Sequence, residues 1–446
     1  MRSNETKAKL LKALSEQDLL LGVIGLGYVG LPFCLATVAH GIKTIGFDID
    51  PSKSAAIASG RSYLNHIPDD DLVKTVASGR FEVSEDFGRL MEPDILVICV
   101  PTPLTPQREP DLSYLIDTAN RIMKCLRPGQ MIILESTTYP GTTNEVLKPI
   151  LERSGLEAHN DFFIAFSPER EDPGNKKFNT SVVPKVVGAD TINEREVAET
   201  FYSIFIEKVF LVGNNKTAEM VKLTENIFRS VNIAMVNELK MISESMGIDI
   251  WEVIEAAKTK PFGFMPFYPG PGLGGHCIPI DPFYLSWKAK EYDITARFIE
   301  LAGEINSAMP YRVVERLSQS LDYVLSKGVK DSKILIVGIA YKKNVDDMRE
   351  SPALKIMEIL DRRSAIVDYF DPLVPAIPAT RAYEKFAGQK SKVWKLDIAA
   401  AYDAILILTD HDIIDYANLV RSANLIVDTR NACRKAGIES KKIYFA

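Results

Sequence analysis

Short hydrophobic runs recur along the first half of the chain, and each ends in a polar or glycine-containing turn. They occupy residues 19–27 (LLLGVIGLG), 43–50 (KTIGFDID), 94–103 (DILVICVPTP) and 130–141 (QMIILESTTYPG). Runs that are apolar at consecutive positions are typical of strands buried on both faces of a parallel sheet. Because segment 28–41 between the first two runs has a helical pattern, we predict an α/β domain.

The middle of the chain has a different pattern. Residues 217–247 contain neither glycine nor proline before Gly247 and are apolar nearly all round their middle. This predicts one long helix that is either buried or part of a subunit contact. Residues 298–328 predict a second long helix, in which Pro310 is expected to mark a break or a helix start.

The strand–helix pattern returns after Asp331. Residues 332–342, 364–372, 403–412 and 424–432 repeat the four earlier hydrophobic runs in the same order. The second copy keeps only Gly338 of the glycine signature of the first.

We therefore predict an α/β protein with two Rossmann-like domains, each a doubly wound parallel sheet, joined by a helical middle. The predicted parts are an N-terminal nucleotide-binding domain (residues 1–212), a central helical and dimerisation region (213–325) and a C-terminal domain (326–446).

Composition narrows the functional classes. Hydrophobic residues make up 46% and charged residues 25% of 446 positions, which is typical of globular proteins. A net charge of −6 does not suggest a nucleic-acid or membrane partner, and no apolar run could span a bilayer. The cysteines lack paired spacing, which argues against a zinc site or disulfides and indicates the reducing cytoplasm. They are Cys34, Cys99, Cys125, Cys277 and Cys433.

The segment GLGYVG carries the most specific local signal. Gly25, Gly27 and Gly30 have dinucleotide-binding spacing between a predicted strand and helix, and Asp48 ends the next strand. An acid at that position binds the ribose 2′-hydroxyl and repels a 2′-phosphate, which favours NAD over NADP. The alternative is a tight turn that binds nothing.

Cys277 lies in the unusual stretch GPGLGGHCIPID, residues 270–281. Its glycines would let backbone and substrate approach the sulfur, and Asp281 could face the same cavity if the segment forms a turn or opens a helix. Cys277 is therefore either a nucleophile or a small buried hydrophobe. His276 is expected to be structural, because adjacent side chains diverge.

Other polar residues stand at positions suited to a site. Lys222 and Asn226 are four residues apart on one predicted helix face, where the lysine is either used in the site or reaches the surface. Thr137 and Glu169 follow predicted strands, at the edge where α/β sheets bind ligands, although caps are common there too.

Basic residues follow the first strand of the second repeat. Lys343 and Arg349 precede a helix predicted to start with Ser351 as its N-cap and Pro352 as its first residue. With Arg430 they form either a site for a second anionic ligand or solvated surface charge.

These motifs, in this order, resemble the UDP-glucose/GDP-mannose dehydrogenase family over nearly the whole chain. The most specific are PGPGLGGHCIPIDP, EMVKLTENIFRSVNIAMVNEL and YKKNVDDMRESPALK. Other stretches are most similar to members that act on UDP-N-acetylglucosamine, and SPER departs from the SPEFLREG run of UDP-glucose dehydrogenases. UDP-glucose, UDP-N-acetylmannosamine and UDP-N-acetylgalactosamine remain alternative substrates. A single-oxidation β-hydroxyacid dehydrogenase and a non-catalytic NAD-binding protein remain more distant alternatives.

The resemblance implies that a sugar C6 alcohol is oxidised twice by NAD to a carboxylate. It also implies the roles of individual catalytic residues. These are Cys277 as nucleophile, Lys222 and Asn226 as oxyanion donors, Asp281 as proton acceptor through water, Glu169 in thioester hydrolysis and Thr137 in holding the water.

The resemblance implies two further groups of binding residues, no metal, and a homodimer or higher homo-oligomer. The cofactor group is Gly25, Gly27, Tyr28, Val29, Gly30, Asp48, Lys53, Thr102, Thr137 and Arg349. The UDP-sugar group is Glu169, Arg170, Lys222, Asn226, Phe267, Gly274, Lys343 and Arg430.

Overall fold

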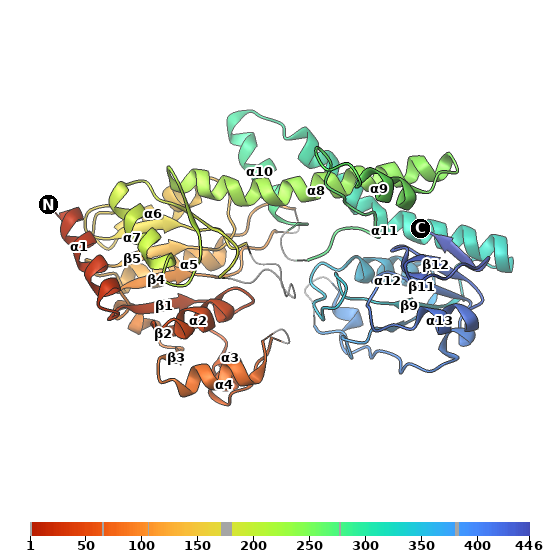
Figure 1. Ribbon diagram of the computed structural model, residues 1–446, viewed down its shortest axis with the longest axis horizontal. Coiled ribbons are helices and arrows are strands. Elements are labelled where there is room, and N and C mark those ends of the chain that lie inside the picture. The colour runs from red at the N-terminus through yellow and green to blue at the C-terminus, as the bar shows by residue number, and fades with distance from the viewer. Residues whose placement is uncertain (1, 65–66, 106, 171–180, 276–277, 380–382) are drawn as a thin grey trace. The chain divides into compact units, whose positions relative to one another are not determined.

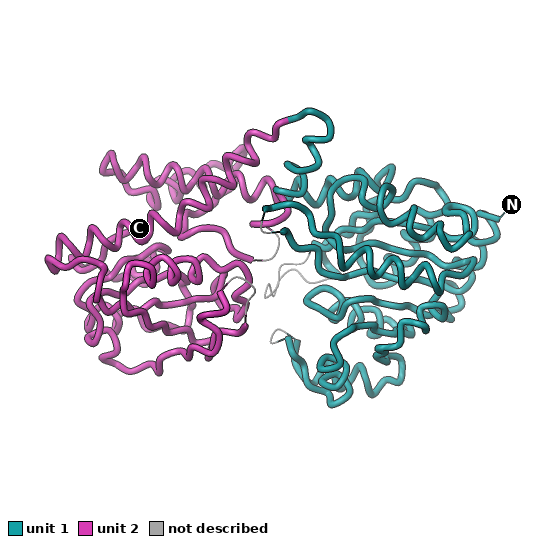
Figure 2. Tube along the Cα trace, turned by 180° about the vertical axis from the view of Figure 1, so that it is seen from behind, with its two compact units in different colours: residues 1–225, 283–294 teal, residues 226–282, 295–446 magenta. Residues whose placement is uncertain are grey.

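The computed structural model divides into two compact units (Figures 1 and 2). One is Met1–Glu225 with Phe283–Ile294, and the other is Asn226–Pro282 with Thr295–Ala446. The structure describes residues 2–64, 67–105, 107–170, 181–275, 278–379 and 383–446.

The first unit contains an eight-stranded sheet in the order β3-β2-β1-β4-β5-β6-β7-β8. Neighbouring strands run parallel except β6 and β7. Every residue of β4, β5, β6 and β7 is buried, as a sheet covered on both faces requires. The strands are β1 (Leu20–Ile24), β2 (Lys43–Phe47), β3 (Phe81–Ser84), β4 (Ile95–Ile98), β5 (Met131–Leu134), β6 (Phe163–Phe166), β7 (Lys185–Gly188) and β8 (Val209–Val212). The helices that belong wholly to this unit are α1 (Arg2–Ser15), α2 (Gly30–Ala39), α3 (Pro51–Ala58), α4 (Asp69–Ala77), α5 (Ser113–Cys125), α6 (Lys148–Glu152) and α7 (Ile192–Tyr202).

The second unit contains a five-stranded, wholly parallel sheet in the order β10-β9-β11-β12-β13. In both units the first strand of the repeat, β1 or β9, lies between the second strand, β2 or β10, and the third strand, β4 or β11. The predicted repeat and the two Rossmann-like sheets are therefore confirmed. The strands are β9 (Lys333–Val337), β10 (Ile366–Phe370), β11 (Ala404–Ile407), β12 (Ile426–Asp428) and β13 (Ile443–Phe445). The helices are α9 (Ile250–Ala257), α11 (Arg297–Leu325), α12 (Pro352–Arg362), α13 (Tyr416–Ser422) and α14 (Ala432–Lys435).

Two further helices contribute residues to both units: α8 (Asn215–Ser245) and α10 (Asp281–Ala289). The predicted long helix is confirmed as α8, which has 31 residues. Within the second unit, Phe228, Met235, Leu239 and Ile242 of α8 are between 41% and 50% exposed. Exposed apolar side chains at such helical spacing favour the subunit-contact alternative over simple burial.

The break or helix start predicted at Pro310 is wrong, because α11 continues through this residue from Arg297 to Leu325. Proline removes one hydrogen bond from a helix interior, but here Pro310 is buried within the second unit. The side chain of Asn306, one turn earlier, is tied to α8 by a 3.1 Å bond to Asn237. Packing of the helix therefore overrides the local preference of proline.

No helix among the described residues is both long and apolar enough to cross a membrane. Over the same residues, no group of three or more metal-binding side chains comes together.

Candidate functional site

The three glycines of the turn between β1 and α2 have two different roles: two allow close chain packing, and one leaves open space. A Cβ on Gly25 would lie 2.7 Å from the Cys99 carbonyl, and one on Gly30 would lie 1.9 Å from the Gly25 carbonyl. Both positions therefore need glycine for chain packing. A Cβ on Gly27 would meet nothing within 4 Å, so the space beside the start of α2 is open for a phosphate.

Asp48 closes β2 beside the same turn and is 5% exposed. Its Oδ2 accepts a 2.8 Å bond from the backbone N–H of Leu26 and pairs with Lys53 Nζ at 2.8 Å. Lys53, which we predict to bind the cofactor, therefore forms an ion pair with Asp48, the predicted ribose-binding acid. Tyr28 and Val29 form the turn that leads into α2.

The loops after β4 and β5 are joined to each other. Thr102 Oγ1 donates a 2.7 Å bond to the carbonyl of Thr137, and the Thr102 carbonyl accepts from the Tyr284 hydroxyl at 2.8 Å. The predicted cofactor residues Thr102 and Thr137 therefore lie together at the carboxyl edge of the first sheet, where α/β folds bind ligands.

Lys222 is 5% exposed and is paired, so it does not simply reach the surface. Its Nζ lies 3.3 Å from Glu169 Oε2 and also donates to the Glu169 carbonyl. Glu169 comes from the loop after β6, so this contact joins α8 to the first sheet. The neighbouring Arg170, predicted to bind substrate, contacts Glu225 at 2.5 Å, and its predicted role stays a prediction.

Glu219 was missed by sequence reasoning, although an acid one turn before Lys222 was a possible signal. It is fully buried and accepts bonds from Gly141 N–H at 2.5 Å, Thr143 N–H at 2.8 Å and Thr143 Oγ1 at 2.6 Å. Burial raises the pKa of Glu219 to about 7, although these hydrogen bonds act in the opposite direction. Glu219 therefore fixes the start of α8 to the loop after β5.

In the second unit, Asn226 Nδ2 donates a 2.5 Å bond to Asp281 Oδ2. Asp281 is 3% exposed and begins α10 after a turn at residues 278–280. The described part of this segment therefore contains both a turn and a helix start, which is the condition set for Asp281 to face the predicted cavity. Cys277 and His276 lie outside the described residues, so their predicted roles stay predictions.

The described part of the glycine stretch, residues 270–275, packs on neighbouring elements of its own unit. A Cβ on Gly270 would lie 2.5 Å from Arg430 Nη1, and one on Gly274 would lie 2.7 Å from Tyr341 Cβ. Gly275 has a φ of +90°, and its N–H donates a 3.0 Å bond to the Arg349 carbonyl. We predicted these glycines for close approach to the sulfur, and the structure gives them a packing role as well.

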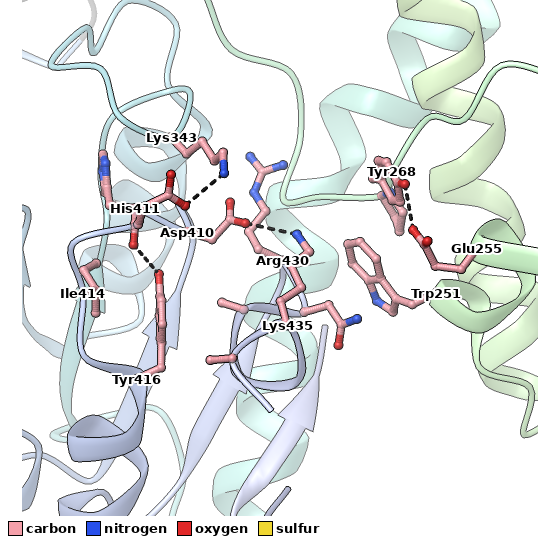
Figure 3. Close-up of a pocket in the computed structure, with 15 residues that line it drawn as sticks. Trp251, Glu255, Tyr268, Lys343, Asp410, His411, Ile414, Tyr416, Arg430 and Lys435 are labelled. Atoms are coloured by element: carbon pink, nitrogen blue, oxygen red, sulfur yellow. Dashed lines mark hydrogen bonds and ion pairs between the residues drawn. The ribbon is translucent and has the colours of Figure 1, made fainter. Parts of the chain in front are cut away.

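A pocket of about 750 Å³ lies at the carboxyl ends of β11 and β12 in the second unit (Figure 3). Its cations differ in their partners. Lys343 pairs with Asp412 at 3.0 Å and Lys435 with Asp410 at 3.1 Å. The labelled side chains in Figure 3 are Trp251, Glu255, Tyr268, Lys343, Asp410, His411, Ile414, Tyr416, Arg430 and Lys435.

Arg430 is the pocket cation best placed for an anion. Its Nε donates to the Leu408 carbonyl at 2.9 Å, and no ion pair joins it to a carboxylate among the described residues. Burial lowers the pKa of its guanidinium, so a bound anion would replace lost solvation. Arg349, by contrast, is engaged by Asp347 through contacts of 2.7 to 3.1 Å. The predicted Ser351 cap on α12 is confirmed.

One predicted binding residue, Phe267, and three other cysteines remain to be described. Phe267 packs edge-on against Phe228 with ring centroids 5.7 Å apart. Burial raises the pKa of Cys34, Cys99 and Cys433, so these thiols are poor nucleophiles at neutral pH.

Comparisons with known proteins match three family models along the chain. These describe the NAD binding domain (residues 20–206), the central domain (216–308) and the UDP binding domain (335–435) of the UDP-glucose/GDP-mannose dehydrogenase family. The matches confirm the resemblance inferred from the motifs, and the first confirms NAD as the cofactor.

Relatives with different substrates match at similar levels. A UDP-N-acetyl-D-glucosamine 6-dehydrogenase of Pseudomonas aeruginosa is 35% identical over 82% of this chain and 86% of its own length. A UDP-N-acetyl-D-mannosamine dehydrogenase of Pyrococcus horikoshii is 33% identical over 93% of this chain and 96% of its own. A solved structure of UDP-D-ManNAc dehydrogenase from Pyrococcus horikoshii has a TM-score of 0.84 at 32% identity, with 96% of this chain and 98% of that chain covered.

Proposed function

Because this chain belongs to the UDP-glucose/GDP-mannose dehydrogenase family, we propose that it oxidises the C6 alcohol of UDP-N-acetylglucosamine to the uronic acid, a surface-polysaccharide precursor. The chain is an NAD-dependent UDP-sugar dehydrogenase, and the choice of sugar is the proposed part. The similarity to the Pseudomonas aeruginosa enzyme supports this choice.

The observation that carries the proposed chemistry is the pair of polar groups one turn apart on α8. Lys222 and Asn226 are each held by a carboxylate, Glu169 and Asp281 respectively. An ammonium and an amide N–H are suitable donors to oxygen that becomes negative during hydride transfer. A buried ammonium such as that of Lys222 would be costly without a function or a partner.

Two oxidations at one site require that the intermediate aldehyde is retained. NAD supplies the acceptor for each hydride when it is bound. The Cys277 thiolate adds to the aldehyde carbon, the resulting thiohemiacetal is oxidised to a thioester, and water cleaves the C–S bond. Overall, the alcohol, two NAD⁺ and one water give the carboxylate, two NADH and three protons.

Asp281 and Glu169 have the proton-transfer roles in this proposal. Asp281 accepts the proton of the C6 hydroxyl through water, and Glu169 assists the water that hydrolyses the thioester, with Thr137 holding a water. Lys222 Nζ lies 3.3 Å from Glu169 Oε2, so the two proposed catalytic groups are in contact.

We place the diphosphate of the substrate at Arg430 in the pocket of the second unit. Arg430 offers planar N–H groups to phosphate oxygens, and Lys343 lines the same pocket. The cofactor belongs at the Gly27 turn of the first unit.

An NADH-release assay across a panel of UDP-sugars tests the proposal. UDP-N-acetylglucosamine should give two NADH per sugar and the highest kcat/KM, and Cys277→Ala should form no acid while still binding NAD. One NADH per sugar would indicate a single-oxidation enzyme, and no NADH with any sugar would indicate a non-catalytic protein. A higher kcat/KM for another UDP-sugar would show that this sugar is the substrate, and the proposed two-step oxidation would still hold.

We also propose a homodimer formed through α8. The exposed apolar side chains Phe228, Met235, Leu239 and Ile242 recur along this helix, and such a stripe on a long helix suits a second copy.

A further inference from the structure

The glycine turn of the second unit has the same backbone contacts as the turn of the first. Gly25 N–H donates to the Phe47 carbonyl at 2.8 Å, and Gly338 N–H donates to the Phe370 carbonyl at 2.9 Å. This register aligns the segment GLGYVG with GIAYKK. Gly27 therefore corresponds to Ala340, and Lys343 takes the place of the third glycine.

Asp371 in the second unit corresponds to the ribose acid Asp48, but it is saturated by the protein. Its Oδ2 accepts bonds from Ile339 N–H at 2.7 Å and Ala340 N–H at 3.1 Å. Asp371 is 3% exposed, and its Oδ1 accepts two further backbone N–H groups. Asp48 accepts the matching bond from Leu26 N–H, so the difference is the second bond, by which Asp371 also takes the N–H of Ala340, the counterpart of Gly27.

His411 connects this turn to the loop that carries Lys343. The ring is fully buried, with Nε2 3.2 Å from Asp371 Oδ2 and Nδ1 accepting a 3.0 Å bond from Asn344 N–H. A backbone N–H can only donate, so Nδ1 carries no proton and Nε2–H donates to Asp371. The imidazole is thus a neutral bridge with one defined tautomer.

Asn344 is held in a strained conformation that needs such support. Its φ is +61°, in the left-handed region. Its Nδ2 donates to Asp412 Oδ2 at 2.6 Å, and Asp412 N–H donates back to its Oδ1 at 3.1 Å. Lys343 Nζ also contacts Asp412, so residues 343–344 are fastened to residues 411–412 by side chains and backbone.

We propose that His411 is a positioning residue for the nucleotide half of the substrate. Its Nδ1 fixes the backbone at Asn344, and this orients the adjacent Lys343 toward the pocket that Arg430 also lines. The inference rests on the proposed function, because it takes the diphosphate of a UDP-sugar as the pocket's ligand.

Two substitutions separate the two contacts of the ring. In His411→Asn, the amide oxygen takes the place of Nδ1 and can still accept from Asn344 N–H. In His411→Gln, the amide nitrogen takes the place of Nε2, and the Asn344 N–H is left without an acceptor. A general loss of packing would affect both variants alike.

We expect His411→Gln to raise the Kd for UDP and the KM for the UDP-sugar about tenfold, whereas His411→Asn changes them less than threefold. The kcat and the KM for NAD should stay near wild type in both. UDP binding is measured by calorimetry and needs no turnover. If the two variants show the expected difference in UDP affinity but the enzyme forms no NADH, only the proposed function is overturned. Equal UDP affinity in the two variants, whether lost or retained, would overturn the positioning role.

A measurement on the wild-type chain covers the case in which neither variant folds. Nitrogen-15 NMR of histidine-labelled protein at pH 7.5 should show His411 neutral with the proton on Nε2. A ring protonated on Nδ1 would overturn the proposal, because the bond from Asn344 N–H could not exist.

Discussion

Single atoms decide which of the two sheets binds a dinucleotide. Gly27 leaves open space beside α2, whereas its counterpart Ala340 has a methyl group and an N–H already bonded to Asp371. The sequence alone showed that the second copy lacked glycines. It did not show that Asp371 accepts a bond from the N–H of Ala340, because that contact joins residues about thirty positions apart.

Gly27→Ala and Gly30→Ala should separate ligand binding from folding. A methyl group at position 27 meets no protein atom, so it should raise the Kd for NAD about tenfold without changing the unfolding temperature. A methyl group at position 30 would overlap the Gly25 carbonyl, so it should lower the unfolding temperature by several degrees. Fluorescence titration with NAD and scanning calorimetry check both, and a destabilised Gly27→Ala would contradict the assignment.

Residue types were easier to predict than their partners. Lys222 and Asn226 could be placed on one helix face from their spacing, but their carboxylate partners are distant in sequence: Glu169 lies in the loop after β6 and Asp281 begins α10. The sequence showed the charge of Arg349 but not its partner. In the fold, Asp347 from the same loop pairs with Arg349 at 2.7 Å.

At the scale of elements, α8 combines a buried face with an exposed one. Its length and continuity could be predicted, since no residue in 217–246 interrupts a helix. The face that each residue occupies depends on tertiary packing. Lys240, for example, is 6% exposed.

Lys240→Met should stabilise the protein at neutral pH. Burial lowers the pKa of Lys240 from 10.5 to about 8, so the unfolded state binds the proton more tightly than the folded state. The unfolding free energy of the wild type therefore rises with pH between about 8 and 10.5. Urea titrations should show a gain of about 1–3 kcal/mol for the variant at pH 7, fading by pH 10.5. A gain independent of pH would rule out this electrostatic cause.

Ile242→Glu should separate the proposed dimer into monomers. A carboxylate on the apolar stripe of α8 would be desolvated without a partner in the contact. Light scattering at micromolar concentration measures the mass. Ile192→Glu is the matched control, because Ile192 on α7 is also an exposed isoleucine, and it should leave the mass unchanged. A monomeric wild type would count against the dimer itself.

At the scale of the molecule, each α/β sheet was predictable because its strands are short, continuous and apolar. The helical middle was less so. The central region predicted at residues 213–325 stays a prediction, and α8 and α10 contribute residues to both compact units. Pro310 suggested a break because local preference was the only information available, and the packing of α11 overrode it.

NAD should stabilise the first unit, and UDP should stabilise the second. NAD and UDP should each raise the unfolding temperature, by mass action worth about 2.7 kcal/mol at a hundred times Kd. Arg430→Met should remove the shift produced by UDP and keep the shift produced by NAD. Thermal unfolding with each ligand checks this, and loss of both shifts would mean that the substitution disrupts the whole fold.

The glycine stretch at residues 270–275 has a consequence for the evolution of sugar preference. Arg430 and Tyr341 occupy the space that side chains at Gly270 and Gly274 would need. The described stretch can therefore offer a sugar mainly backbone groups, which are the same for every sequence. A lineage that changes from one amino sugar to another can do so at positions other than Gly270 and Gly274, so these glycines can persist while the substrate changes.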